Sequence, residues 1–251
     1  MPGSLPTRDA AVSGSADPAS YRDVAKGAAY RQKAMPDLAP AIRTRGPSSG
    51  PVLRHRVTFE KIGDARFLSH RNTMDVLERA IRASGLPARY SEGFNPHMKL
   101  SMGPALPLGL ESRHEVFDVE GTAAFEPDAA ARINEKLPPG LRALEVRPLA
   151  STEKSLSKAI TGARYAVRLD SDEQVERASA AISESWRENM PALKEVGLET
   201  DAGGPRLLFE INLDQSAGET TTPKKVLEAL LAIPPAEQAA LSVTREATVL
   251  R

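Results

Sequence analysis

Histidine is the side chain best suited to acid–base chemistry near neutral pH, and the chain holds four of them within 60 residues. They are His55, His70, His97 and His114. His70 stands at the expected start of a helix and could act as a general acid or base, although such a histidine more often hydrogen-bonds a neighbouring loop. Because the sequence has no HExxH motif and no close histidine pair, we expect no metal site.

The stretch SEGFNPHMKLSMGPALPLGLES, residues 91–112, threads polar groups between glycines and prolines. Long connections with little regular structure are more often functional than not. Its prolines stiffen the chain, so we expect a rigid loop that presents polar side chains to a polyanion or a partner. In the alternative interpretation, apolar residues of the loop plug the open side of a sheet; these are Phe94, Met98, Leu100, Leu106 and Leu108.

Arginines on the preceding helix could extend this surface, because a planar guanidinium pairs well with phosphate. Intrahelical ion pairs with Asp75 and Glu78 would explain the same arginines on a solvated face. His70 and His97 are the candidate catalytic residues. The candidate binding residues are Arg66, Ser69, His70, Arg79, Arg82, Tyr90, Ser91, Glu92, Asn95, His97, Lys99 and Ser101.

Hydrophobic periodicity predicts the elements that must position these residues. Residues 53–62, 98–102, 114–121 and 141–149 are predicted strands. Ser69 is a candidate N-cap for a helix that ends at Gly85, and a second helix is expected within 126–140. The order strand, helix, strand, strand, helix, strand is that of a ferredoxin-like domain.

The same order recurs in the second half of the chain. We expect a strand at 164–170, a helix at 171–186, a hairpin at 194–214, a helix from Thr222 and a final strand at 241–250. The fold class is therefore predicted as α+β, with two tandem ferredoxin-like (βαββαβ) domains at 51–150 and 151–251. Residues 1–50 are rich in Ala, Ser, Gly and Pro, and we expect them to form a disordered tail.

Composition narrows the classes of function. The chain has 33 basic and 33 acidic residues and no cysteine, which excludes disulfides, a thiol nucleophile and an iron–sulfur cluster held by its own thiolates. No segment approaches the roughly 20 apolar residues that cross a bilayer, and the N-terminus lacks the apolar centre of a signal peptide. We expect a cytoplasmic protein with no cofactor and no membrane contact.

Between Arg66 and Glu120 the chain resembles the bacterial radical-SAM-linked proteins, a family of unknown function found alone or joined to a cobalamin-binding radical SAM enzyme. The matching stretches are RFLSH (66–70), LERAIRASGLP (77–87), YSEGFNPHMKLSMGPALPLGLES (90–112) and EVFDVE (115–120). The resemblance implies a radical SAM enzyme as a partner, since a chain without cysteine cannot hold the cluster itself.

We expect an accessory or recognition module that works with a radical SAM enzyme and binds RNA or an RNA–protein particle through residues 91–112 and the first helix. Against RNA, aromatic residues make up only 4% of the chain and no RNP-like run is present. Two alternatives stay open. One is a metal-independent RNA-processing enzyme with His70 or His97 as acid–base and Lys99 or Arg71 stabilising the transition state; the other is a pure protein-interaction scaffold.

Overall fold

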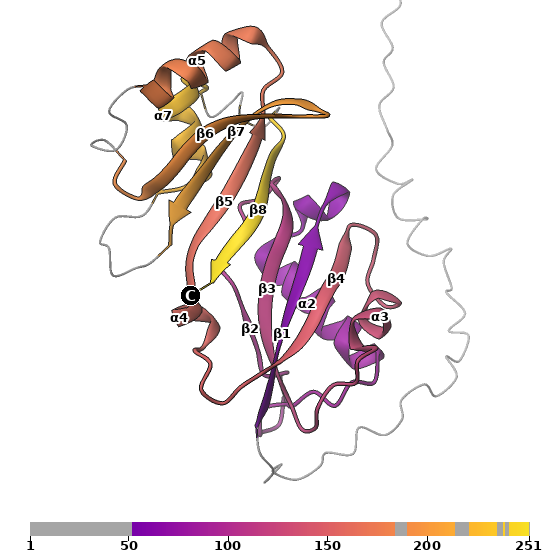
Figure 1. Cartoon of the computed structure of the whole chain (residues 1–251). Coiled ribbons are helices and arrows are strands. Elements are labelled where there is room, and N and C mark those ends of the chain that lie inside the picture. The colour runs from indigo at the N-terminus through magenta and orange to yellow at the C-terminus, as the bar shows by residue number, and fades with distance from the viewer. Residues whose placement is uncertain (1–51, 184–189, 214–220, 235–237, 239–240, 251) are drawn as a thin grey trace, which may run out of the picture. The chain divides into compact units, whose positions relative to one another are not determined.

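The computed structural model describes residues 52–183, 190–213, 221–234, 238 and 241–250 (Figure 1). These residues all belong to one compact unit, Pro47–Arg251. The predicted tail, residues 1–50, lies outside the described residues, as does the end of the predicted helix at 171–186.

The described residues form a mixed α+β fold, as the sequence predicts. Its sheet has eight strands: β1 (Leu53–Lys61), β2 (Leu100–Met102), β3 (Glu111–Gly121), β4 (Leu141–Leu149), β5 (Ile160–Arg168), β6 (Leu193–Asp201), β7 (Gly204–Asn212) and β8 (Val243–Leu250). The helices in this part of the chain are α2 (His70–Ala83), α3 (Ala129–Asn134), α4 (Leu156–Ala159), α5 (Asp172–Ser183) and α7 (Pro223–Leu231), with a 3-10 turn η1 (Gly63–Phe67).

The strand order shows how the two halves of the sequence join. The order is β4-β1-β3-β8-β5-β7-β6, and β2 pairs with β3 beside this path. All pairings are antiparallel except that of β3 with β8, which is parallel and joins Glu111 to Thr244 and Ser112 to Arg245. The first half thus has the order β4-β1-β3-β2 and the second half β8-β5-β7-β6, and a short ladder makes the sheet continuous (Figure 1).

Local sequence accounts for the ends of the longest helix. The Ser69 hydroxyl accepts a hydrogen bond from the Asn72 amide at 3.1 Å, which satisfies one of the free donors at the start of α2. After α2, Gly85 adopts a φ of 70°, a left-handed conformation that glycine takes without strain. The helix therefore begins and ends where the sequence predicts.

One face of each half of the sheet is covered by helices and forms a hydrophobic core. In the first half, α2 and α3 pack on side chains of β1 and β3; this cluster includes Val57, Phe59, Phe117, Val119, Leu77, Ile81 and Ile133. In the second half, α5 and α7 pack on β5 and β7; this cluster includes Tyr165, Val167, Phe209, Ile211, Ala178, Val226 and Leu227. We call the face away from these helices the open face.

A buried arginine joins the two halves on the helix-covered side. Arg245 of β8 is 2% exposed and donates to the Glu115 carboxylate of β3 at 2.8 Å and to the Tyr165 hydroxyl of β5 at 2.9 Å. Its guanidinium also donates to the carbonyl oxygens of Pro104 and Ala105, at 3.2 and 3.4 Å. Arg245 therefore holds the connection before β3 against the strands of the second half.

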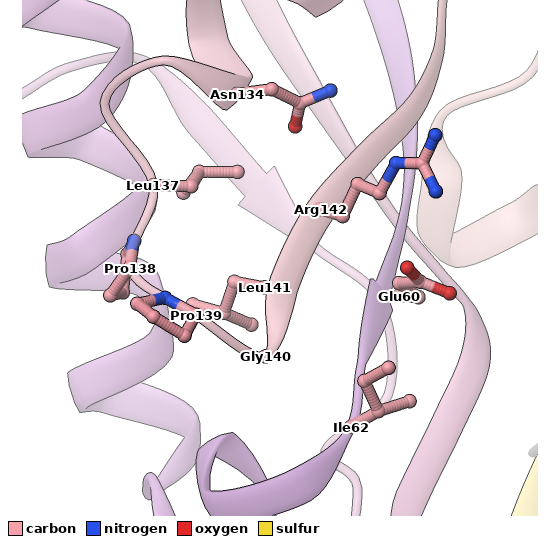
Figure 2. Close-up of a pocket in the computed structure, with 9 residues that line it drawn as sticks. All are labelled: Glu60, Ile62, Asn134, Leu137, Pro138, Pro139, Gly140, Leu141 and Arg142. Carbon is pink, nitrogen blue, oxygen red and sulfur yellow. The ribbon is translucent and has the colours of Figure 1, made fainter.

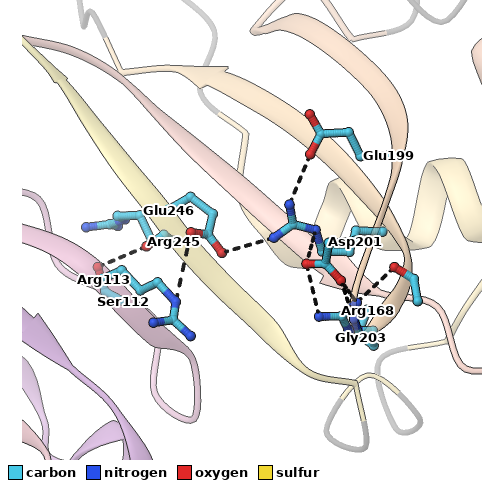
Figure 3. A network of polar contacts seen from close by, with 10 residues as sticks. Ser112, Arg113, Arg168, Glu199, Asp201, Gly203, Arg245 and Glu246 are labelled. Carbon is cyan, nitrogen blue, oxygen red and sulfur yellow. Dashed lines mark hydrogen bonds and ion pairs between the residues drawn. The ribbon is translucent and has the colours of Figure 1, made fainter.

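A second polar network crosses the same joint on the open face (Figure 3). Arg206 of β7 contacts Glu199 and Asp201 of β6 and, at 3.8 Å, Glu246 of β8. Glu246 in turn lies 4.0 Å from Arg113 of β3. Exposed pairs of this kind contribute little each, whereas removing one partner of a buried pair such as Arg245 and Glu115 is strongly destabilising.

None of the helices in the described ranges is long and apolar enough to cross a lipid bilayer.

Candidate functional site

Residues 90–98 form a closed hairpin between α2 and β2. Tyr90 and Met98 make an antiparallel bridge, and the Ser91 amide donates to the His97 carbonyl at 2.7 Å. The His97 amide returns a hydrogen bond to the Ser91 hydroxyl at 2.9 Å. These contacts fix the base of the hairpin, and the residues between them, 92–97, are all exposed.

Phe94 at the tip of this hairpin is fully exposed, with a relative accessibility of 105%. Large aromatic side chains usually bury most of their surface. The backbone of the hairpin is held by hydrogen bonds at its base, and Phe94, the one large apolar side chain among the exposed residues 92–97, points into solvent. The ring of Phe94 is therefore available for contact from solvent.

The rest of the predicted loop has a different role. Leu106 and Leu110 are buried in the core of the second half, and the Gly109 amide donates to the Arg66 carbonyl at 3.0 Å. Together with the Arg245 contacts to Pro104 and Ala105, this makes residues 103–110 a packed connection between the two halves. The predicted single rigid face is therefore divided into an exposed hairpin, the short strand β2 and a connection that packs against the second half through Leu106 and Leu110.

The alternative in which five apolar residues plug the sheet also holds only in part. Met98 and Leu106 are buried and Leu100 is half-buried, whereas Phe94 and Leu108 are exposed.

Arg82 and Tyr90 link the end of α2 to the hairpin. The Arg82 Nε donates to the Tyr90 hydroxyl at 3.3 Å, and its guanidinium lies 5.6 Å from the ring centre. Arg79 is exposed one turn earlier and donates to the carbonyl oxygen of Asp75. In the described part of the chain neither arginine forms an ion pair, so the alternative explanation by intrahelical salt bridges with Asp75 and Glu78 is not supported for these two residues.

Arg66, Ser69 and His70 lie at the other end of α2. His70 is exposed at the first helical position, and Arg66 lies 3.8 Å from Glu111 and over the ring of Phe67. Because α2 has 14 residues and rises by 1.5 Å per residue, about 20 Å separates its two ends. The two candidate catalytic residues, His70 and His97, do not share a site.

Lys99 and Ser101 follow the hairpin and line a pocket of about 270 Å³ on the open face. Ser101 lies opposite Asp118, whose carboxylate accepts two hydrogen bonds from the buried Arg56, at 2.7 and 2.9 Å. The hydrogen bond with Asp118 raises the pKa of Arg56, so the guanidinium is charged. The pocket's lining residues are Arg54, Lys99, Leu100, Ser101, Asp118, Val119, Glu120, Ser155 and Leu156.

A larger hollow of about 420 Å³ lies where β1 and β4 meet the turn before β4. Figure 2 shows Leu137, Pro138 and Pro139 on one side of it and Glu60 and Arg142 on the other. The Asn134 amide is already bound to both backbone groups of Ala143. None of the predicted binding residues lines this hollow, and its free polar groups are few.

The other two histidines have structural roles. His55 stacks on Phe125 with ring centres 4.0 Å apart, and its Nε2 accepts from the Phe125 amide at 3.1 Å. Burial lowers the pKa of His55, so it is neutral near pH 7. His114 accepts from the Thr248 amide. No group of three metal-ligating side chains occurs among the residues that the structure describes.

The structure thus divides the predicted site residues into three groups. The hairpin group includes Arg82, Tyr90, Ser91, Glu92, Asn95 and His97, with Arg79 nearby on α2; the α2 start includes Arg66, Ser69 and His70; the open-face pocket includes Lys99 and Ser101. Sequence reasoning missed the pocket residues Arg54, Asp118, Glu120 and Ser155. The alternation of LRHRVTFEKI did carry a signal, because it places Arg54 and Arg56 on the face opposite Val57 and Phe59.

Comparisons with known proteins add a family and two remote structures. The profile of a family described as "Uncharacterized protein conserved in bacteria (DUF2344)" matches residues 54–231. No curated protein matches the chain. The chain is similar to an unknown protein from Galdieria sulphuraria, at 14% identity over 78% of this chain and 98% of that one, with a TM-score of 0.26. It is also similar to a putative glycine cleavage system transcriptional repressor, at 9% identity over 76% and 95%, with a TM-score of 0.24.

Proposed function

The chain belongs to the DUF2344 family of uncharacterized bacterial proteins, and from this premise we propose that it is an accessory module that recognises RNA through the hairpin at residues 90–98. The observation that carries the proposal is the full exposure of Phe94 on a hairpin whose base is hydrogen-bonded. An exposed aromatic ring offers a stacking platform to any unpaired base, and such stacking contributes about 1–3 kcal/mol per base.

Positive charge near the hairpin supports RNA as the partner. Arg82 contacts the hairpin at Tyr90, Arg79 lies one turn away and Lys99 follows the hairpin directly. In the described residues none of these three side chains has an acidic partner. Free cations beside a stacking ring suit the alternating bases and phosphates of a single strand.

The sheet itself is unsuited to this role. Proteins that bind RNA on a sheet use exposed aromatic side chains of the central strands. Here the strand aromatics are buried beneath helices; they are Phe59, Phe117, Tyr165 and Phe209. We therefore assign RNA recognition to the hairpin.

The strand orders β4-β1-β3-β2 and β8-β5-β7-β6 support the further proposal that the two halves are tandem ferredoxin-like domains, 51–150 and 151–251. The proposal of a radical SAM enzyme as the protein partner depends on the family resemblance and on the absence of cysteine. In this scheme the enzyme supplies the reaction and this chain brings the RNA or RNA–protein particle to it.

A photo-crosslinking experiment tests the proposal. An aryl-azide amino acid replaces Phe94 in the full chain, and a matched control replaces Leu198, a 37% exposed side chain on β6. After irradiation in cells, we expect RNA to be crosslinked from position 94 and not from position 198. Crosslinks to protein alone would support the scaffold alternative instead, and equal yields at both positions would refute recognition by the hairpin.

A further inference from the structure

The pocket beside the hairpin is built from four separate segments. Arg54 comes from the start of β1, Lys99 and Ser101 from β2 and the residue before it, Glu120 from β3, and Ser155 from the turn before α4. Its volume of about 270 Å³ is near the lower limit of small-molecule sites, so it suits a small polar group.

The pocket carries an excess of positive charge. Glu120 lies directly opposite Arg54 in the β1–β3 register, its amide donates to the Lys99 carbonyl, and its carboxylate is 3.9 Å from Arg89. The lining therefore holds two cations, Arg54 and Lys99, and two acids, Asp118 and Glu120, and each acid has its ion-pair partner in an arginine outside the lining, Arg56 or Arg89. The Arg54 Nη2 donates only to the carbonyl oxygens of Ala150 and Glu153, and Lys99 has no ion-pair partner in the described part of the chain.

The remaining acids near the pocket are already neutralised. Both carboxylate oxygens of Asp118 accept a hydrogen bond from the buried Arg56. The Glu153 carboxylate is bound by Arg147 at 3.1 Å and by the Ala150 amide at 3.0 Å. These carboxylates therefore leave the charge of Arg54 and Lys99 uncompensated.

Two hydroxyl groups complete the donors around the pocket. Ser101 and Ser155 are both exposed at the rim, and the Ser155 hydroxyl is 3.4 Å from that of Ser157. A guanidinium, an ammonium and two hydroxyls form a donor set typical of a phosphate site.

We infer that this pocket binds a phosphate dianion, either inorganic phosphate or a terminal phosphomonoester. A phosphomonoester carries a charge of about −1.5 to −2 at pH 7, which matches the two uncompensated cations. A phosphodiester within an RNA chain carries a single charge and is a poorer match. The inference goes beyond RNA recognition and does not depend on it, because the pocket's own residues define the ligand.

Titration of the full chain with inorganic phosphate, followed by NMR chemical shifts of the 99–101 and 118–120 amides, tests the inference. We expect saturable shifts in the wild type and an affinity at least about tenfold lower in Lys99→Gln, since a charge-assisted hydrogen bond is lost. The matched control is Lys225→Gln, an exposed lysine on α7. Equal affinities in these two variants, or shifts that never saturate, would overturn the inference.

A pair of RNA oligonucleotides separates this inference from the proposed function. One carries a 5′-phosphate and the other, of the same sequence, a 5′-hydroxyl. We expect the wild type to prefer the phosphorylated strand and Lys99→Gln to lose that preference. If both strands bind equally well and phosphate alone does not bind, the pocket inference fails and RNA recognition stands; if phosphate binds and neither strand does, the reverse holds.

Discussion

Replacing Arg245 by Met should destabilise the joint between the two halves. Methionine keeps an unbranched apolar stem but is shorter than arginine and removes its five donors. The change leaves the Glu115 carboxylate buried without its arginine and frees the Tyr165 hydroxyl and the carbonyls of Pro104 and Ala105.

The structure sets the size of the effect. Removing one partner of a buried ion pair typically costs about 3–5 kcal/mol. Lys61 reduces this cost. Burial lowers the pKa of Lys61, Glu115 partly offsets this and Arg245 adds to it, so the loss of Arg245 makes a charged Lys61 easier to hold beside Glu115. We therefore expect a loss of about 3 kcal/mol, near the lower end of that range.

Urea denaturation of the full chain measures this loss, with Arg164→Met as the matched control. Arg164 also pairs with a glutamate of a neighbouring strand, Glu210 at 3.2 Å, but its side chain is 48% exposed. Glu210 is itself buried but keeps Lys194 at 3.6 Å after this change, so we expect a loss of only about 0–1 kcal/mol. Hydrogen exchange should also show faster exchange of the amides of residues 105–110 in Arg245→Met and unchanged exchange there in the control.

The double variant Arg245→Met with Glu115→Gln gives a second test. The double variant removes the buried charge that Arg245→Met leaves unpaired. Its loss of unfolding free energy should therefore be smaller than the sum of the two single losses by at least about 1 kcal/mol. Equal losses in Arg245→Met and Arg164→Met, with no coupling in the double variant, would refute the view that Arg245 holds the joint.

Three further predictions concern the hairpin and the histidines. Phe94→Ala should weaken RNA binding about 5- to 150-fold by fluorescence anisotropy without changing the urea midpoint, since it removes one stacking platform and no core contact, whereas Leu198→Ala should change neither. Burial lowers the pKa of His55, so the imidazole takes up a proton more readily in the unfolded state than in the folded one. The free energy of unfolding should therefore be highest above the ordinary pKa of 6.5 and fall as the pH drops below it. His55→Phe should abolish this contribution to the pH dependence. His70→Ala and His97→Ala should leave the length of bound RNA unchanged on a gel; RNA cleavage by the wild type that either variant abolished would support the enzyme alternative.

The sequence by itself determined the local elements of this protein. The Ser69 cap, the apolar spacing of α2 and the alternation of β1 each depend on neighbours a few residues away, so helix and strand positions could be read from them. The absence of cysteine likewise fixed which chemistries the chain cannot perform.

Only the tertiary structure decided which part of residues 91–112 forms an exposed hairpin and which part packs against the second half. It also decided where the charged side chains Arg245, Arg54 and Lys99 lie. Nothing in the sequence around Arg245, TREATVL at residues 244–250, indicates that this arginine is buried, because its partners Glu115 and Tyr165 lie 130 and 80 residues away. The same holds for Leu106, which packs into the core of the other half, and for the pocket of Arg54 and Lys99, which four segments build. Periodicity shows which face of an element is apolar, but strand order and register decide which distant residues meet across it.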